Sequence, residues 1–376
     1  MTEQTKSPRA LLCTVVPSIF LGMKTRWCTV LIGVVLASSL LVAQSSSDNS
    51  LLILSKRGHT LAIVDPATLK VLAKVPVGDD PHEVIASTDG RTAYVSNYGG
   101  GSLHTLAVVN LMDQKAMPAI DLDPLHGPHG LTFVGGKTWF TVEGSKAIGR
   151  FDPATRRIDW VLGTGQDRTH MIWVSEDEKK IVTANVASGT MTLMELMARR
   201  QAPGGPPPGA PRPAGAPTGP PLGPRGPDWE ATVVKVGSGP EGFDVLGDGT
   251  TIWVANAQDG TVSIIDFASR KVIDTLAVDA RGANRLKFTL DGKTALISSL
   301  GGSELVFVDV ASRKVIKRLK IGTGAAGIVM QPDGLRAFVA CSPDDYVAVI
   351  DLKTMEVVGK IDAGGEPDGM AWAVRR

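Results

Sequence analysis

Residues 284–325 read NRLKFTLDGKTALISSLGGSELVFVDVASRKVIKRLKIGTGA and contain one complete copy of a repeated unit. Short apolar segments alternate in it with turn residues, first the pair Asp291-Gly292 and later the segment VDVASRKV at 308–315. Asp-Gly between alternating apolar residues is the strongest short signal of a β-hairpin, with both turn residues expected at positive φ. The unit therefore predicts four antiparallel strands joined by tight turns.

The same two turns recur along the chain at a nearly constant spacing. Asp-Gly pairs begin at positions 248, 291 and 333, and an earlier pair begins at 89. The Asp of the second turn is expected to accept hydrogen bonds from backbone amides within the turn. Its copies are VDPATLKV at 64–71, FDPATRRI at 151–158, IDFASRKV at 265–272 and IDLKTMEV at 350–357. A four-stranded unit of roughly 40–45 residues has the dimension of a β-propeller blade.

The repeats predict seven blades in a single domain over residues 51–376. The chain opens with only three strands, at 51–78, and ends with one lone strand, at 368–376. We expect these to pair and close the ring, because closure leaves only short, protected edges. An open β-solenoid is the alternative, but it leaves the orphan strands unexplained. In register, the seven first strands start at His82, His129, His170, Glu241, Asn284, Ala326 and Asp368.

The N-terminal segment predicts export. Residues 23–43 have a short basic start followed by the apolar run CTVLIGVVLASSLLV and a small residue, Ala43. This order is typical of a cleaved signal peptide, and the run is short for a membrane span. Residues 1–22 read as an upstream mis-start. We expect a secreted or periplasmic protein with no membrane span in the mature chain, and an uncleaved anchor helix is the alternative.

Bulk composition excludes several classes of partner and site. The formal net charge is +1, so no overall electrostatic case exists for binding nucleic acid. Cys13 and Cys28 precede the predicted mature start, which leaves Cys341 without a disulfide partner. We expect a monomer stabilised by burial and strand pairing.

A Pro- and Gly-rich tract interrupts the fourth blade. Residues 201–227 read QAPGGPPPGAPRPAGAPTGPPLGPRGP and stand where the other blades carry the second turn. Proline cannot donate to a β-ladder and glycine has no side chain to bury, so the tract predicts a disordered or partly polyproline II insertion. A solubilising loop is favoured over a docking segment.

The ends of the predicted second strands resemble a known repeat family. AYVSN ends at Asn97, IVTAN at Asn185 and IWVAN at Asn256, each before a turn. These strings, with PHEVIASTDG at 81–90 and PEGFDVLGDG at 240–249, resemble the YVTN repeat family. The resemblance implies an exported seven-bladed propeller with varied roles. Architectural relatives include lactonases, streptogramin-type lyases and copper enzymes. Other residues replace the Asn in four blades: Ser55, Glu143, Ser299 and Cys341.

The starts of the first strands and the ends of the second strands open on one mouth of the channel, where chemistry is expected. His82, His129 and His170 occupy equivalent positions in three consecutive blades and are candidate ligands for a transition metal, Cu or Zn. Glu143 and Glu241 are candidate acid–base residues. The candidate ligand-binding residues are Asn97, Asn185, Asn256, Asn284, Arg285 and Asp368.

Each candidate has a structural alternative. Histidine at such a strand start can also pack or bond a loop carbonyl, and Asn at a strand end can hold the following turn. The favoured interpretation is a non-catalytic propeller that binds a small molecule or a protein at the mouth, since fold alone confers no chemistry. A His-ligated metalloenzyme and a lactonase or lyase remain as alternatives.

Overall fold

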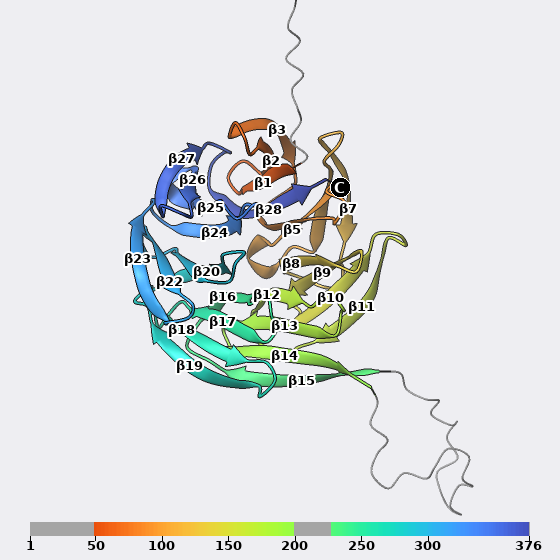
Figure 1. The fold of residues 1–376 in the computed structure, drawn as a ribbon. Helices are drawn as coiled ribbons and strands as arrows, with labels where there is room; N and C mark the ends of the chain where they lie inside the picture. Colours follow the sequence, from red (N-terminus) through yellow and green to blue (C-terminus); the bar gives the residue numbers. More distant parts are fainter. Residues whose placement is uncertain (1–48, 199–226, 376) are drawn as a thin grey trace, which may run out of the picture. The chain divides into compact units, whose positions relative to one another are not determined.

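The computed structural model describes residues 49–198 and 227–375. In these ranges, 28 strands form seven four-stranded antiparallel sheets, and the only helices are the single 3₁₀ turns η1 (Gly99–Gly101) and η2 (Ser342–Asp344). Figure 1 shows the sheets arranged as blades around a central axis. The predicted all-β, seven-bladed propeller is confirmed.

Each blade runs outward from the channel in the order of the chain, apart from the first blade. The innermost strands are β28 (Pro367–Val374), β4 (Pro81–Ala86), β8 (Pro128–Val134), β12 (Thr169–Val174), β16 (Pro240–Val245), β20 (Ala283–Phe288) and β24 (Ala325–Met330). The second strands are β1 (Asn49–Ser55), β5 (Thr92–Asn97), β9 (Lys137–Val142), β13 (Lys180–Asn185), β17 (Thr251–Asn256), β21 (Thr294–Ser299) and β25 (Arg336–Cys341).

The two outer positions complete the blades. The third strands are β2 (Thr60–Asp65), β6 (Thr105–Asn110), β10 (Ala147–Asp152), β14 (Thr190–Met197), β18 (Thr261–Asp266), β22 (Glu304–Asp309) and β26 (Tyr346–Asp351). The outermost strands are β3 (Lys70–Pro76), β7 (Lys115–Asp121), β11 (Arg157–Gly163), β15 (Asp228–Lys235), β19 (Lys271–Ala277), β23 (Lys314–Lys320) and β27 (Glu356–Ile361).

Burial along the strands explains their sequences. The second and third strands carry runs of buried apolar residues, such as LAIV in β2 and IWVA in β17, because neighbouring blades cover both of their faces. The outermost strands β11 and β19 instead alternate exposed and half-buried residues, since they form the rim.

The hydrophobic core is divided among the spaces between blades. Seven clusters of buried side chains each join two neighbouring blades; one packs Leu52 and Ile63 of the first blade against Val95 and Val109 of the second. Each innermost strand also contacts the innermost strands of both neighbours, which completes the ring. Every blade is therefore stabilised mainly by its two neighbours.

The ring closes by the predicted pairing of the first and last strands. β28 is hydrogen-bonded to β1, with Leu51 opposite Trp372 and Ile53 opposite Met370, and β2 and β3 complete that sheet. Figure 1 shows β28, in blue, beside the orange β1. The closing sheet packs Leu51 and Ile53 against Phe338 of the last blade.

The Asp-Gly turns differ from the prediction in one respect. Only the glycine has a positive φ, for example 67° at Gly90, whereas Asp89 does not. The Gly90 amide donates to the Ser87 carbonyl at 2.9 Å, and the Asp89 carboxylate accepts from the Arg91 amide at 3.1 Å. The Asp side chain thus caps the turn from an ordinary backbone conformation. The predicted caps in the second turn are confirmed, as the Ala67 amide donates to Asp65 at 2.9 Å.

Several predictions fall outside the described residues. These are the upstream segment 1–22, the signal peptide 23–43 and residues 201–226 of the Pro-rich tract, which follows β14 and precedes β15. Within the described ranges, no helix is long and apolar enough to cross a membrane.

Candidate functional site

One mouth of the channel holds a cavity of about 480 Å³. The second residue of every innermost strand lines it, so all seven blades contribute one side chain from the same position. These residues are His82, His129, His170, Glu241, Asn284, Ala326 and Asp368. The sequence register placed all seven of these strand starts, and the structure brings them together.

Close approach of the blades fixes the backbone of this ring. In four blades the next residue is glycine, at Gly130, Gly242, Gly327 and Gly369. An added Cβ at these glycines would lie only 2.3–2.5 Å from the carbonyl oxygen of the second residue in the following blade. Glycine is therefore required for the innermost strands to pack at this distance.

Buried hydroxyl groups tie neighbouring blades together at the same carbonyls. Ser96 donates to the His129 carbonyl at 2.8 Å, and Thr141 donates to the His170 carbonyl at 2.7 Å. Ser298 makes the same bond to Ala326 at 2.6 Å. The backbones of two candidate histidines are thus held by the blades that precede them.

We expect Thr141→Val to lower the free energy of unfolding by about 1–3 kcal/mol, because the His170 carbonyl and the Gly130 amide, which donates to Thr141 at 2.8 Å, would both lose a buried partner. Chemical denaturation measures the change. Thr155→Val, at an exposed turn, is the control and should stay within about 0.5 kcal/mol of the unmodified protein. An equal effect of both substitutions would contradict this role of Thr141.

His170 lies between two carboxylates. Its Nδ1 is hydrogen-bonded to Glu143, and its Nε2 is 3.5 Å from a carboxylate oxygen of Glu241. Burial alone lowers the pKa of His170, but the two carboxylates outweigh it and raise the pKa above its ordinary value. In turn, although burial opposes ionisation, His170 lowers the pKa of Glu241 to about 2. The two carboxylates therefore favour the protonated, imidazolium form of His170.

Glu143 is the most enclosed acid of the mouth. It follows β9 and is 5% exposed, and Tyr98 donates to it at 2.6 Å. Burial raises the pKa of Tyr98 to about 12, with a further contribution from this bond to Glu143. Arg168 lies 3.4 Å from the same carboxylate. From the third blade, Glu143 thus contacts side chains of the second and the fourth blades.

His129 stacks on His170 and differs from it in charge. The ring centroids are 3.8 Å apart and the planes are tilted by 36°. Burial, followed by the electrostatic interactions with His170 and His82, holds the pKa of His129 well below its ordinary value. His129 is therefore a neutral imidazole, the form that can act as a ligand.

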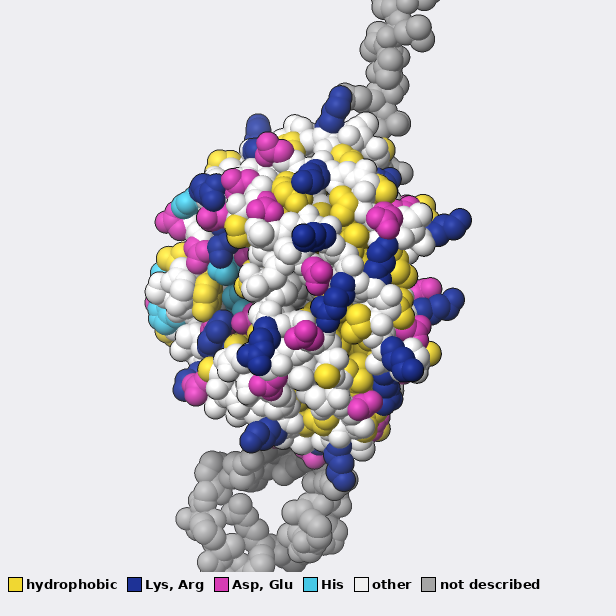
Figure 2. Space-filling view, turned by 90° about the vertical axis from the view of Figure 1, so that its left-hand side faces the viewer, with side chains coloured by type: hydrophobic (Ala, Val, Ile, Leu, Met, Phe, Trp, Pro, Cys, Tyr) yellow, Lys and Arg dark blue, Asp and Glu magenta, His cyan; other side chains and the backbone are white. Residues whose placement is uncertain are grey.

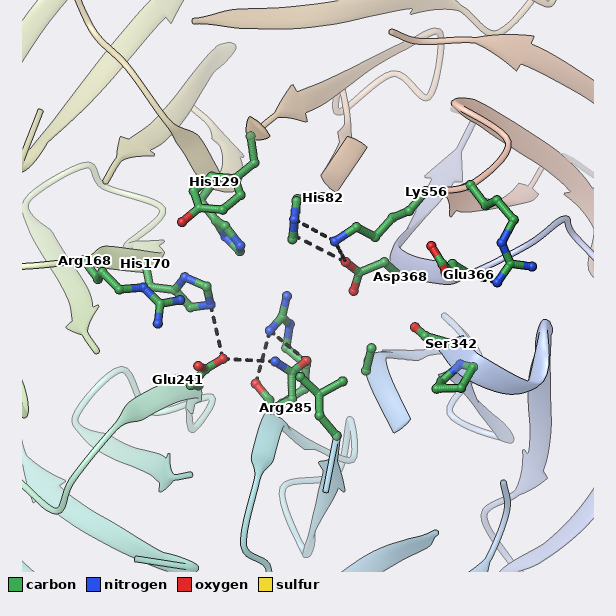
Figure 3. Close-up of a pocket in the computed structure, with 16 residues that line it drawn as sticks. Lys56, His82, His129, Arg168, His170, Glu241, Arg285, Ser342, Glu366 and Asp368 are labelled. Carbon is green, nitrogen blue, oxygen red and sulfur yellow. Dashed lines mark hydrogen bonds and ion pairs between the residues drawn. The ribbon is translucent and has the colours of Figure 1, made fainter. Parts of the chain in front are cut away.

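His82, in the blade next to that of His129, belongs to a separate polar group. Its Nε2 is 2.7 Å from Nζ of Lys56, and its Nδ1 is 3.4 Å from Asp368. Lys56 also pairs with Asp80 at 3.4 Å and with Asp368 at 3.6 Å. Figure 3 shows Lys56, His82 and Asp368 converging there, away from His170 and Glu241.

A buried ion pair crosses the channel below the mouth. Arg285, which follows Asn284 in β20, donates to Glu83 of β4. These two strands lie on opposite sides of the ring. Burial opposes the charge of Arg285, but the fields of Glu83 and Asp368 raise its pKa further. Asn284 accepts a hydrogen bond from Arg285 at 3.1 Å and donates to Glu241 at 3.0 Å. The Arg285–Glu83 pair therefore connects Asn284 and Glu241, on one side of the mouth, with β4 on the other.

Three predicted ligand-binding residues are not at the cavity. Asn97 donates to the carbonyls of Val77 and Asp79, both at 2.9 Å, and so holds the loop before β4. The amide of Asn185 donates to Thr190 and Thr192 within its own blade. Asn256 donates to Thr261 and Ser263 in the equivalent way. These contacts favour the structural alternative for the three asparagines, in which they hold neighbouring loops and strands.

Sequence reasoning missed several residues that line or support the mouth. They occupy two repeat positions, directly after a second strand or directly before an innermost strand. Periodicity at these two positions could have found them. They are Lys56, Tyr98, Leu300, Ser342, Arg168 and Glu366. Glu83 was missed for a different reason, because only the fold brings it to Arg285.

Histidine is confined to this face. All six histidines of the chain lie in the described residues, either at innermost strand starts or in the loops at the same end of the blades. In Figure 2 the cyan side chains gather along one side, where the surface is hollowed, while lysine, arginine, aspartate and glutamate are interspersed over the rest of the view.

Comparison with protein families supports the fold. A family model described as a YNCE-like β-propeller matches residues 225–336, which is less than half of the chain. No curated protein matches in sequence. The chain is a β-propeller on both this match and its structure.

Solved structures of similar fold differ widely in their descriptions. A functionally unknown protein from Desulfotomaculum acetoxidans is 12% identical with a TM-score of 0.65, covering 86% of this chain and 98% of that one. A protein from Bacteroides fragilis described as a "putative 6-phosphogluconolactonase" is 15% identical with a TM-score of 0.66, covering 87% and 99%. Hydrazine synthase from Kuenenia stuttgartiensis is 16% identical with a TM-score of 0.59, covering 77% and 89%. At these identities the likeness shows the fold alone.

Proposed function

We propose that the protein is an exported, YVTN-type propeller that binds a small polar molecule at the channel mouth without transforming it. The observation that carries this proposal is the ring of seven strand starts around one cavity. Positions that only build a repeat fold should be alike in every blade, yet this ring holds histidine, glutamate, asparagine, alanine and aspartate. A cavity of about 480 Å³ is within the ordinary range for small-molecule sites.

The charges of the mouth define the ligand class. Cationic and acidic side chains alternate around the cavity, as Arg168, Glu241, Arg285, Asp368 and Lys56 illustrate (Figure 3). Such a lining offers both donors and acceptors around the cavity. It favours a hydroxylated small acid, whose carboxylate would meet the guanidinium groups while its hydroxyls donate to the carboxylates.

Lactone hydrolysis is the main alternative, and the geometry favours it less. Hydrolysis needs a general base that can take a proton from water. His170 is oriented by Glu143 as a base would be, but the two carboxylates raise its pKa and favour its protonated form. A protonated imidazole held between Glu143 and Glu241 cannot take a proton from water, which suits binding without hydrolysis.

We expect D-gluconate to bind the purified mature protein in isothermal titration calorimetry, and Arg168→Met to weaken that binding by roughly 10–100-fold. The estimate follows from the loss of a hydrogen bond to a charged group, about 1.5–3 kcal/mol. Arg313→Met, which removes an exposed arginine paired with Asp274 on the rim, is the control and should bind as the unmodified protein does.

Two results would count against this proposal. Equal gluconate affinity in the Arg168 and Arg313 variants would show that gluconate does not bind at the mouth. Hydrolysis of gluconolactone by the protein, lost on replacement of His170 by Gln, would establish the lactonase alternative instead.

A further inference from the structure

We infer that the channel mouth also contains a site for one divalent transition-metal ion, ligated by His129, His170 and Glu143. This site goes beyond the proposed binding of a small molecule and does not depend on it. It also differs from the three-histidine set that the repeat register suggested, because it replaces His82 by a glutamate.

The donor atoms are already gathered. One ring nitrogen of each histidine and one carboxylate oxygen of Glu143 all lie within 4.8 Å of one another. All three side chains are buried; the exposed fractions of His129 and His170 are 2% and 3%. Two imidazoles and a carboxylate are a donor set used by catalytic zinc sites and by other first-row metals.

An unpartnered nitrogen atom points independently to a ligand. Nδ1 of His129 is buried and has no hydrogen-bond partner among the described residues. Buried polar atoms are nearly always paired, so this exception needs an explanation. A metal ion in the plane of the His129 ring would use the lone pair of this nitrogen.

The surroundings are those of a supported metal site. Tyr98 donates to Glu143 at 2.6 Å, and the carbonyls of both histidines are held by Ser96 and Thr141. Outer partners of this kind fix the orientation of metal ligands. Glu241, 3.5 Å from His170, places a second carboxylate beside the site.

His82 is left out of the ligand set because both of its nitrogens are occupied. Lys56 lies 2.7 Å from one, and Asp368 lies 3.4 Å from the other. Its ring is 4.9 Å from that of His129, compared with 3.8 Å between His129 and His170. The structure therefore assigns the ligands to the third and fourth blades alone.

The test loads the purified mature protein with Co²⁺, or separately with Zn²⁺, followed by exhaustive dialysis and elemental analysis. We expect one equivalent of metal per chain and a visible absorption spectrum for bound Co²⁺ that reports nitrogen and carboxylate ligands. His129→Ala and His170→Ala should lose the metal under the same dialysis. Glu143→Gln, which keeps its shape and the contact with Tyr98, should bind at least 10–100-fold more weakly.

The control variants separate this site from the other histidines of the same face. His59→Ala and His104→Ala remove exposed rings that pair with Asp79 and Asp121, and both should retain a full equivalent. His82→Ala should also retain it, provided that circular dichroism shows each variant folded.

Several outcomes overturn the inference. No retained metal in the unmodified protein would do so, as would equal retention in the folded His129→Ala variant. Loss of metal in His104→Ala would place the ion at the exposed pair of His104 and His126, whose rings are 5.9 Å apart. Because the probe is the metal alone, failure of gluconate binding has no bearing on these results.

Discussion

Truncation of the chain after Glu366 is expected to abolish cooperative folding of the propeller. It removes β28, the only partner of β1 on its inner edge, and takes the innermost strand from the first blade. It also removes the buried side chains of Met370, Ala371 and Ala373. A large buried side chain contributes roughly 1.5–3 kcal/mol, and the ladder and the two adjoining interfaces add to this. The sum is comparable with the whole stability of a typical domain, about 5–15 kcal/mol.

Thermal unfolding followed by circular dichroism measures the effect, and a peptide added in trans provides the control. A peptide of residues 367–375 should restore part of the cooperative transition, because β28 contacts β1 in its own blade and β4 and β24 in the two neighbouring blades. The same peptide with Met370→Asp and Trp372→Asp should restore nothing. A truncated chain that melts at the temperature of the full chain would contradict the closing role of β28.

Glu83→Gln is expected to destabilise the protein by about 3–5 kcal/mol, because it leaves the buried guanidinium of Arg285 without its carboxylate partner. Both side chains are largely buried, at 6% and 11% exposure. The double variant Glu83→Leu/Arg285→Met should recover much of this loss, since an apolar pair needs no charge compensation. Arg285→Met alone should resemble Glu83→Gln.

Urea denaturation of the unmodified protein, Glu83→Leu, Arg285→Met and the double variant Glu83→Leu/Arg285→Met gives the coupling free energy directly. The matched control is Asp274→Asn, which breaks the rim pair with Arg313 and should cost less than about 1 kcal/mol, because both of those side chains are exposed. If Glu83→Gln lowers the free energy of unfolding no more than the control does, the cross-channel pair contributes no more to stability than an exposed rim pair.

The fold could be predicted because it repeats. Four copies of the Asp-Gly turn and five copies of the second turn, with apolar alternation between them, define the same blade repeatedly, and the orphan strands at 51–78 and 368–376 predicted their own pairing. The detail that went wrong was local. A backbone angle at Asp89 depends on which amide its carboxylate reaches, and the pattern of residue types does not contain that information.

The site was predictable only where it follows the register. The seven strand starts were placed because equivalent positions in a propeller must converge on the axis. The pairing of Glu83 with Arg285 joins blades that are far apart in sequence, and that of His170 with Glu143 joins two consecutive blades. Both depend on how far the side chains reach, which the register does not give. The three asparagines show the converse, because at equivalent positions Asn97 holds a backbone loop and Asn185 and Asn256 bond hydroxyl groups within their own blades, away from the cavity.

In the ring of strand starts, the backbone and the side chain of each residue have separate roles. At six of the seven positions, the backbone carbonyl contacts the neighbouring blade, through a hydroxyl donor or a close-packed glycine, while the side chain faces the cavity. The carbonyl is the same in every amino acid, so a change of side chain there leaves the inter-blade contact intact. Such a scaffold can acquire a new ligand preference by point mutation, one blade at a time, with little loss of stability along the way.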